Sequence, residues 1–197
     1  MRVVITGGQG QVARALAANA PSAWEVSTLT RQELDITDAR SIHDAMKRNN
    51  PSLVVNAAAY TAVDKAETDE EAAFLVNGQG VANLTEICAS IDARLVHFST
   101  DFVFNGNQSR PYRRDDKPAP RSVYGKSKLS GELEALKLPA NLVIRTAWVY
   151  GHSGANFVKT MLRLMGERQE VRVVSDQIGT PTHAQSLARA MVTPHAE

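Results

Sequence analysis

Short apolar runs alternate with helical patterns along most of this chain. Five runs have the length and the composition of buried strands, at residues 2–6, 25–30, 53–56, 95–100 and 142–146. Between them, apolar residues recur with a helical period, most clearly over residues 41–49 and 69–91. Because strands and helices alternate in this way, we predict an α/β fold with a doubly wound parallel sheet and right-handed crossovers.

The pattern changes after Gly151. A helix is predicted over residues 156–167, a short strand over 171–175 and a Gly/Pro turn over 178–182. We therefore expect two parts: a domain of residues 1–150 that contains the sheet, and a partial substrate-binding region of residues 151–197.

Composition and charge exclude several classes of function. Of the 197 residues, 43% are hydrophobic and 22% are charged, and the formal net charge of +1 provides no basic field for nucleic acid. No apolar segment reaches membrane-spanning length, and the N-terminus has no signal-peptide arrangement. We therefore expect a cytoplasmic globular protein with neither nucleic acid nor a membrane as its partner.

Cysteine and histidine give no support for a metal site. The lone Cys88 lies in an apolar helical pattern and is interpreted as a buried structural thiol, which fits a reducing compartment. The five histidines lack metal-binding spacing: His43, His97, His152, His183 and His195. We predict no transition-metal site.

The first strand runs into a glycine-rich turn and then a helix. Gly7 and Gly10 are followed by Ala13, which stands where a third glycine would assist helix packing. At such a junction, glycine lets the backbone approach a pyrophosphate, whose charge is held by NH groups at the helix N-terminus. We therefore predict a dinucleotide site in a Rossmann-like domain, with a plain turn as the alternative.

The second strand is followed by Arg31 instead of the acidic residue that commonly binds the ribose 2′-hydroxyl of NAD. A guanidinium suits a 2′-phosphate, so NADPH is favoured over NADH, and a solvated loop arginine is the alternative. Asp35 and Ile36 follow in the same loop, where they could flank the adenine.

Small and polar residues follow the third and fourth strands. Alanines at residues 57–59 would leave room for a ligand at the carboxyl edge of a parallel sheet, although core packing also uses alanine. Ser99, Thr100 and Asp101 place two hydroxyls and a carboxylate at the same edge, where catalytic groups are expected. A helix cap or a turn is the alternative for these three residues.

A helix with a tyrosine and a lysine one turn apart is expected to begin just after Pro118 and Pro120. Positions i and i+4 share one helix face, so Tyr124 and Lys128 should lie side by side. A nearby cation would stabilise the phenolate and lower the pKa of Tyr124 from its usual value of about 10. Such a pair can exchange a proton with a substrate oxygen, whereas a surface helix that carries both residues by chance is the alternative.

Five ordered motifs resemble the extended short-chain dehydrogenase/reductase family. They are Gly7-x-x-Gly10, residues 56–59, residues 99–101, Tyr124-x-x-x-Lys128 and residues 145–151. Within that family, residues 63–67, 156–161 and 176–182 resemble the dTDP-4-dehydrorhamnose reductases. The resemblance implies NADPH-dependent reduction of the C4 ketone of dTDP-4-dehydro-L-rhamnose to dTDP-L-rhamnose. Two points stay open: NADH is possible as a second cofactor, and the protein could form a homodimer.

The resemblance also implies roles for individual residues. Tyr124 would protonate the developing alkoxide, Lys128 would hold the nicotinamide ribose and Thr100 would hydrogen-bond the sugar oxygen, while the cofactor supplies the hydride. The implied cofactor-binding residues are Gly7, Gly10, Gln11, Val12, Arg31, Asp35, Ile36, Ala57, Ala58, Ala59, Thr61, Asn77, Ser99, Tyr124 and Lys128. The implied substrate-binding residues are Asp101, Phe102, Val103, Trp148, Asn156 and Phe157.

Departures from the family pattern keep other functions open. Phe102 stands where many members carry a tyrosine, and where a dehydratase would need a glutamate. An epimerase would retain bound NAD, which Arg31 does not favour. Family members also continue well past residues 176–182, so we expect part of the substrate domain to be missing from this chain. A non-catalytic, reductase-like regulatory subunit is therefore a further alternative.

Overall fold

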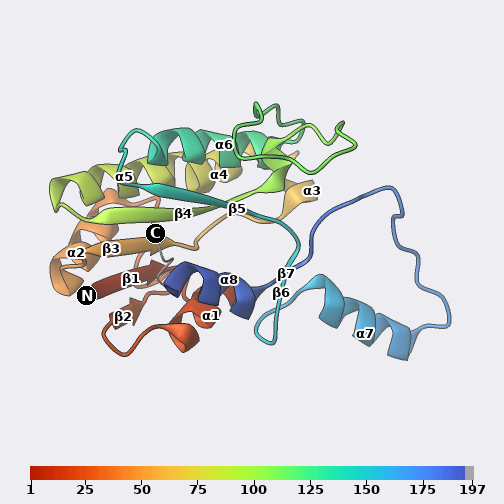
Figure 1. The fold of residues 1–197 in the computed structure, drawn as a ribbon, viewed down its shortest axis with the longest axis horizontal. Coiled ribbons are helices and arrows are strands. Elements are labelled where there is room, and N and C mark those ends of the chain that lie inside the picture. Colours follow the sequence, from red (N-terminus) through yellow and green to blue (C-terminus); the bar gives the residue numbers. More distant parts are fainter. Residues whose placement is uncertain (194–197) are drawn as a thin grey trace.

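A five-stranded parallel sheet lies at the centre of the computed structural model, which describes residues 1–193 (Figure 1). Its strand order is β2-β1-β3-β4-β5, and every neighbouring pair is parallel. The strands are β1 (Arg2–Thr6), β2 (Glu25–Thr28), β3 (Leu53–Asn56), β4 (Arg94–Thr100) and β5 (Leu142–Thr146). The predicted doubly wound α/β fold is confirmed, and the bounds of these strands lie within two residues of those expected.

Helices cover both faces of the sheet (Figure 1). One face is covered by α1 (Gln11–Asn19) and α8 (Ala184–Val192). The other face is covered by α2 (Ala39–Asn49), α5 (Gly80–Ser90) and α6 (Val123–Ala135). The sheet therefore lies between two helical layers, as a doubly wound fold requires.

Alternation along the strands explains why both faces are covered. In β1, Val3 and Ile5 pack into one core with α1 and α8, while Val4 packs into the other core with α2 and α5. A parallel strand that is buried on both sides reads as a nearly continuous apolar run. Buried polar side chains are found instead at the strand ends, such as Thr6 and Asn56, and this is the edge where the site lies.

The helical pattern at residues 69–91 is not one helix. It comprises α4 (Glu70–Phe74), a π-helical turn η1 (Leu75–Gln79) and α5. Asn77 lies in this turn, where its Oδ1 accepts from the Tyr60 N–H at 2.9 Å and its Nδ2 donates to the Tyr60 oxygen at 3.0 Å. The interruption of the apolar pattern at Asn77 is therefore a change of helix type.

Beyond β5 the chain leaves the five-stranded sheet and forms a separate two-stranded one. β6 (Val149–Tyr150) pairs in parallel with β7 (Thr182–His183), and α7 (Phe157–Glu167) lies between them in sequence. The predicted strand at residues 171–175 is wrong: this segment is irregular, because within residues 1–193 no strand runs beside it to pair with its backbone. Two short helices, α3 (Val63–Ala66) and η2 (Asp101–Val103), have no counterpart in the sequence pattern.

The division of the chain at residue 150 stays a prediction. α8 lies past that boundary, yet Ala184 and Ala188 are buried in the same core as Val3 and Ile5. Residues 194–197, with His195 and the end of the predicted substrate-binding region, lie outside the described residues. No helix within residues 1–193 is long and apolar enough to cross a membrane.

Candidate active site

The glycine turn after β1 lies directly against the end of β3. Gly7 has a φ of +66°, and a Cβ added to it would lie 2.8 Å from the Ala58 nitrogen. Only glycine fits this position, because the backbone conformation is left-handed and the neighbouring atoms belong to backbone. The structure thus brings together Gly7, Ala57 and Ala58, three of the predicted cofactor-binding residues.

The helix that follows this turn has an open N-terminus. The cap residue Gly10 has no side chain that could accept hydrogen bonds from the first N–H groups of α1. Gln11 and Val12 form the first residues of α1, and Gln11 Nε2 donates to the Val149 oxygen at 3.0 Å. The predicted strand, turn and helix are confirmed, and they have the form of an anion-binding junction.

The loop after β2 contains Arg31, the predicted partner of a cofactor 2′-phosphate. The Arg31 side chain is 77% exposed, and its Nε lies 3.1 Å from Asp35 Oδ2. The loop reaches the glycine turn, because the Gly8 N–H donates to the Leu29 oxygen at 2.8 Å. Ile36 is different: its side chain is buried in the core, where a Cβ added to Gly80 would meet it at 2.8 Å.

Thr100 ends β4 and caps the short helix η2. Its Oγ1 donates to Asp101 Oδ1 at 3.0 Å and accepts from the Phe102 N–H at 3.2 Å. The cap that was considered as the alternative for these residues is therefore present. It does not exclude a role in catalysis, because η2, which Thr100 caps, lies against Tyr124 through the Phe102 ring.

Tyr124 lies in the first turn of α6, as predicted. Ser122 caps this helix by accepting from the Gly125 N–H at 3.0 Å. The Phe102 ring contacts the Tyr124 ring edge-on, with 5.6 Å between centroids. Burial raises the pKa of Tyr124, the hydrogen bond from Thr100 lowers it, and the Asp101 carboxylate raises it, so that the net shift is upward. The predicted lowering of this pKa by Lys128 is wrong.

The direction of the Lys128 side chain explains that correction. Lys128 is only 2% exposed, and its Nζ donates to the Phe98 oxygen at 2.7 Å and lies 3.3 Å from His97 Nε2. Burial lowers the pKa of Lys128 to about 7, against the Glu132 carboxylate, which raises it. The ammonium is therefore held against β4, and it is a weaker cation at neutral pH than an exposed lysine.

A row of polar side chains leads from β1 to Lys128, and only Asn56 among them belongs to a predicted motif. Thr6, Asn56 and His97 are directly paired in register on β1, β3 and β4. All three are fully buried. A polar residue at a buried strand position was the available sequence signal, because His97 interrupts an otherwise apolar strand.

Two other predicted cofactor-binding residues, Asn77 and Ser99, are buried and differ in their hydrogen bonding. Asn77 is buried, and its Nδ2 donates to Ser127 Oγ at 3.0 Å, which ties η1 to α6. The two helices approach closely here, since a Cβ added to Gly131 would lie 2.1 Å from the Asn77 oxygen. Ser99 Oγ is buried without a hydrogen-bond partner among residues 1–193. The Ala59 and Thr61 backbone belongs to the irregular segment between β3 and α3.

The predicted substrate-binding residues fall into two groups. Asp101, Phe102 and Val103 form η2 beside Tyr124, although the Val103 side chain is completely buried. Trp148 has a φ of +47° and packs on Gly179, while Phe157 is largely exposed on α7.

Asn156 joins the glycine turn to the second group. It caps α7 by accepting from the Lys159 N–H at 3.1 Å, and its Nδ2 donates to Gln11 Oε1 at 3.4 Å and to the Gly151 oxygen at 2.9 Å.

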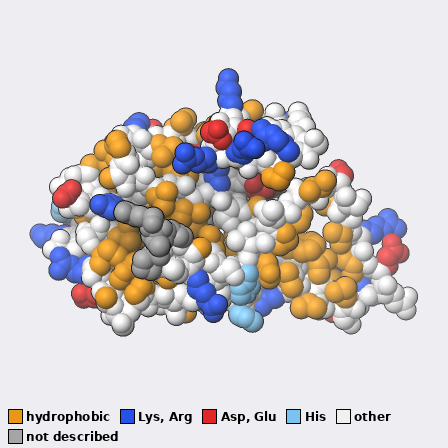
Figure 2. Space-filling view, viewed as in Figure 1, with side chains coloured by type: hydrophobic (Ala, Val, Ile, Leu, Met, Phe, Trp, Pro, Cys, Tyr) orange, Lys and Arg blue, Asp and Glu red, His pale blue; other side chains and the backbone are white. Residues whose placement is uncertain are grey.

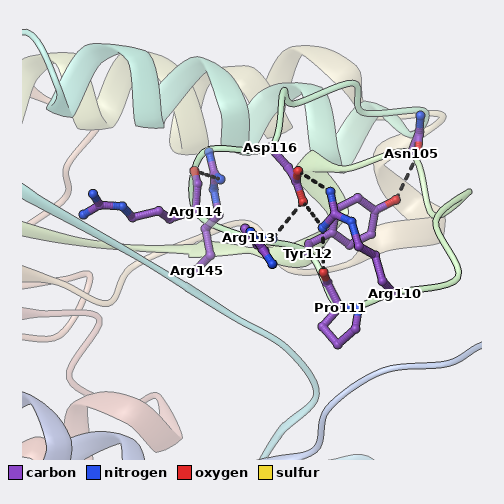
Figure 3. Close-up of polar contacts among 8 residues, drawn as sticks. All are labelled: Asn105, Arg110, Pro111, Tyr112, Arg113, Arg114, Asp116 and Arg145. Atoms are coloured by element: carbon purple, nitrogen blue, oxygen red, sulfur yellow. Dashed lines mark hydrogen bonds and ion pairs between the residues drawn. The ribbon is translucent and has the colours of Figure 1, made fainter.

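The loop between η2 and α6 is fixed by ionic and aromatic contacts (Figure 3). The Arg110 guanidinium donates two bonds to the Asp116 carboxylate at 2.7 and 2.9 Å, and this cation holds the pKa of Asp116 down to about 2. Tyr112 stacks on Phe104 and donates to Asn105 Oδ1 at 3.0 Å. The loop is therefore held in one conformation by contacts within it. Within residues 1–193, no group of three His, Cys, Asp or Glu side chains could hold a metal ion.

Known proteins resemble this chain along nearly its whole length. Residues 1–196 match the family described as RmlD substrate binding domain. The chain is 45% identical to the spore coat polysaccharide biosynthesis protein SpsK of Bacillus subtilis, over 97% of this chain and 68% of that protein. It is 43% identical to the dTDP-4-dehydrorhamnose reductase of Sinorhizobium fredii, over 98% of this chain and 66% of that protein.

A solved structure shares the fold. The dTDP-4-dehydrorhamnose reductase of Bacillus anthracis, in complex with NADP, superposes with a TM-score of 0.93 at 37% identity, over 96% of this chain and 68% of that one. The chain thus spans about two thirds of the length of the relatives it matches.

Proposed function

The chain belongs to the RmlD substrate-binding domain family, and from this premise we propose that it carries the cofactor site and the catalytic groups of a dTDP-4-dehydrorhamnose reductase. The reaction would be the NADPH-dependent reduction of the C4 ketone of dTDP-4-dehydro-L-rhamnose to dTDP-L-rhamnose. The observation that carries the proposal is the position of Tyr124 against η2, which Thr100 caps, at the same carboxyl edge of the sheet as the glycine turn.

The raised pKa of Tyr124 suits a proton donor. Because burial keeps the phenol protonated at neutral pH, Tyr124 can deliver its proton to the C4 oxygen as negative charge develops there. Thr100 caps η2, whose Phe102 ring packs edge-on against the phenol. Bound NADPH would supply the hydride, and Lys128 would hold the nicotinamide ribose.

The glycine turn and Arg31 support the choice of cofactor. The close approach of Gly7 to the Ala58 backbone and the uncapped N-terminus of α1 fit a pyrophosphate. Arg31 is exposed and lies at the end of the neighbouring strand, where a guanidinium suits a 2′-phosphate. We propose NADPH as the preferred cofactor, with NADH as the weaker one.

The wider setting of the reaction is part of the proposal. A nucleotide sugar as substrate agrees with the names of the relatives, while the cytoplasmic location and the homodimer remain expectations. Two alternative functions remain to be tested. A dehydratase or epimerase of the same fold is disfavoured by Phe102 and Arg31, and a non-catalytic regulatory subunit by the presence together of Thr100, Tyr124 and Lys128.

Tyr124→Phe tests the assignment, measured in the whole protein that carries this chain. Phenylalanine keeps the contact with Phe102 and removes only the proton donor, so turnover should fall about a hundred- to ten-thousand-fold. NADPH affinity, followed by fluorescence, should stay within about twofold, because the loss falls on the transition state.

Tyr112→Phe is the matched control, since it removes a phenol that bonds only the loop residue Asn105. Retention of more than about a tenth of turnover in Tyr124→Phe would show that another group is the acid. Equal wild-type affinities for NADPH and NADH would contradict the cofactor choice. Release of a 4-keto-6-deoxy sugar from dTDP-glucose without NADPH consumption would instead identify a dehydratase.

A further inference from the structure

The buried polar row that ends at Lys128 has a fixed direction. Asn56 Oδ1 accepts from Thr6 Oγ1 at 2.6 Å and from the Ala58 N–H at 3.2 Å. Two donors on one oxygen set the orientation of the Asn56 amide, so that its Nδ2 is the atom that faces His97 Nδ1, at 3.0 Å.

The orientation of the amide determines the tautomer of His97. An amide nitrogen can only donate, so His97 Nδ1 must be an acceptor and carry no proton. The ring is neutral, because burial and the nearby Lys128 lower the pKa of His97 well below its ordinary value. A neutral imidazole without a proton on Nδ1 carries it on Nε2. The Nε2–H therefore points toward Lys128 Nζ, 3.3 Å away.

A donor facing Lys128 has a consequence for that residue. An ammonium has three donors and no acceptor, whereas a neutral amine has one lone pair. Lys128 Nζ already donates to the Phe98 oxygen at 2.7 Å, and its lone pair can accept from the His97 Nε2–H only when Lys128 is neutral. Protonation of Lys128 would require His97 to move its proton to Nδ1, and this would place two donors, His97 Nδ1 and Asn56 Nδ2, face to face.

We propose that His97 is a positioning residue that holds Lys128 as a neutral amine through a hydrogen-bond chain from Thr6 and Asn56. Lys128 takes up a proton only when the chain reverses direction. The role rests on the proposed function, in which Lys128 holds the nicotinamide ribose and acts beside Tyr124. It makes Lys128 a group that titrates near neutral pH, so contacts that need its positive charge weaken as the pH rises past neutrality.

The charged groups around Lys128 do not account for its state by themselves. Glu132 lies one turn further along α6 and attracts a proton to Lys128, but its carboxylate also pairs with Arg145 of β5 at 2.6 and 2.8 Å. Asp101, in η2, acts on Tyr124. From β4, the group that faces Lys128 is neutral His97.

The tautomer of His97 can be measured without any substitution in the site. In the whole chain labelled with ¹⁵N-histidine, long-range ¹H–¹⁵N spectra distinguish a ring with its proton on Nε2 from one with its proton on Nδ1 and from an imidazolium. We expect the Nε2–H form at pH 8 to 9, where Lys128 is neutral, and a change to the Nδ1–H form below about pH 7 as Lys128 takes up its proton. The Nδ1–H form or an imidazolium at pH 8 to 9 would overturn the proposal, whether or not the protein reduces a sugar.

A second measurement follows Lys128 itself. In protein labelled with ¹³Cε-lysine, the Lys128 signal, assigned with Lys128→Met, should titrate near pH 7. His97→Gln should move the midpoint upward by about one pH unit or more, because the glutamine oxygen can turn to accept from the ammonium.

His43→Gln is the matched control, since His43 is exposed on α2, and its midpoint should equal that of wild type. A wild-type midpoint near that of a free lysine, or an equal midpoint in folded His97→Gln, would refute the proposal. If His97→Gln fails to fold, the tautomer and the wild-type titration still decide. Both are recorded without cofactor or substrate, so neither outcome depends on the proposed reaction.

Discussion

α6 and α7 are helices of 13 and 11 residues that differ completely in burial. α6 buries seven residues: Val123, Gly125, Ser127, Lys128, Gly131, Glu132 and Ala135. α7 buries none, and its apolar residues Phe157, Leu162 and Met165 are exposed. Figure 2 shows hydrophobic side chains gathered over the region that Figure 1 labels α7.

The sequences of the two helices suggest the reverse. α7 has apolar residues at helical spacing, whereas the buried face of α6 contains a lysine, a glutamate and a serine. Apolar periodicity thus reports that a helix can pack against a surface, and it does not report whether it does. α6 is buried through small residues and paired polar groups, and these are the means by which a chemical group is held inside a protein.

The buried ion pair of α6 is expected to give the largest effect. Glu132→Gln leaves the partly buried Arg145 guanidinium without its carboxylate, so the free energy of unfolding in urea should fall by about 3 kcal/mol. Glu134→Gln on the same helix is the control, because the pair of Glu134 with Lys137 is much more exposed and should contribute less than about 1 kcal/mol. Equal effects would mean that the burial of Glu132 is unimportant.

Close packing of α6 should give the next largest effect. A Cβ at position 131 would lie 2.1 Å from the Asn77 oxygen, so Gly131→Ala forces α6 away from η1. We expect a loss of about 2 kcal/mol in urea unfolding, which outweighs the gain in helix propensity. An unchanged midpoint would show that the two helices can separate without cost.

The pH dependence of stability should reveal the burial of Lys128. Its pKa is lowered to about 7 from an ordinary value of 10.5, so between these values the unfolded chain binds more protons and the free energy of unfolding rises with pH. From pH 7 to 8.5 the rise should be about 1 to 2 kcal/mol in wild type relative to Lys128→Met.

The range stops at pH 8.5 because Cys88 acts in the opposite direction. Burial raises the pKa of Cys88 from 9.0 to about 12, so above this range the unfolded thiol ionises first and stability falls. Parallel curves for wild type and Lys128→Met would indicate that Lys128 is solvated in the native protein.

α7 should give the smallest effect. Nothing lies within 4 Å of a Cβ added to Gly166, so Gly166→Ala adds only helix propensity, about 1 kcal/mol. Amide exchange within α7 should slow by up to about fivefold, while the urea midpoint of the whole chain stays the same because α7 buries no residue. A shift of the urea midpoint of the whole chain would show that α7 packs against the rest of the protein, contrary to the exposure of its residues.

Local sequence patterns predicted most of the fold and part of the site. The apolar runs located the strands of the sheet, and the spacing of Gly7 and Gly10 located the turn. These features depend on residues close together in the chain. The direction of Lys128 does not, because it is set by His97 and Phe98 on a strand about thirty residues earlier. For the same reason the pKa of Tyr124 was predicted with the wrong sign.

One further error, and one packing contact that was not predicted, have a similar origin. Residues 171–175 have the composition of a strand, but a strand needs a partner, and none lies beside it in the described chain. α8 follows a Gly/Pro turn, and its place on α1 is decided by the fit of Ala184 and Ala188 against the sheet. A single sequence reports the local propensity for helix or strand. Strand pairing and helix packing depend as well on whether a distant segment provides a partner strand or a packing surface.

The pairing of β6 with β7 brings together the two ends of the segment between them. Val149 lies opposite Thr182 and Tyr150 opposite His183, so the two ends of residues 151–181 lie beside each other in the separate two-stranded sheet. A segment with this geometry can be cut out, shortened or exchanged for that of a relative at two neighbouring joints. Under the proposed function, residues 151–181, which would contact the sugar, can therefore change in sequence among relatives. The five-stranded sheet and the buried Lys128 can stay the same.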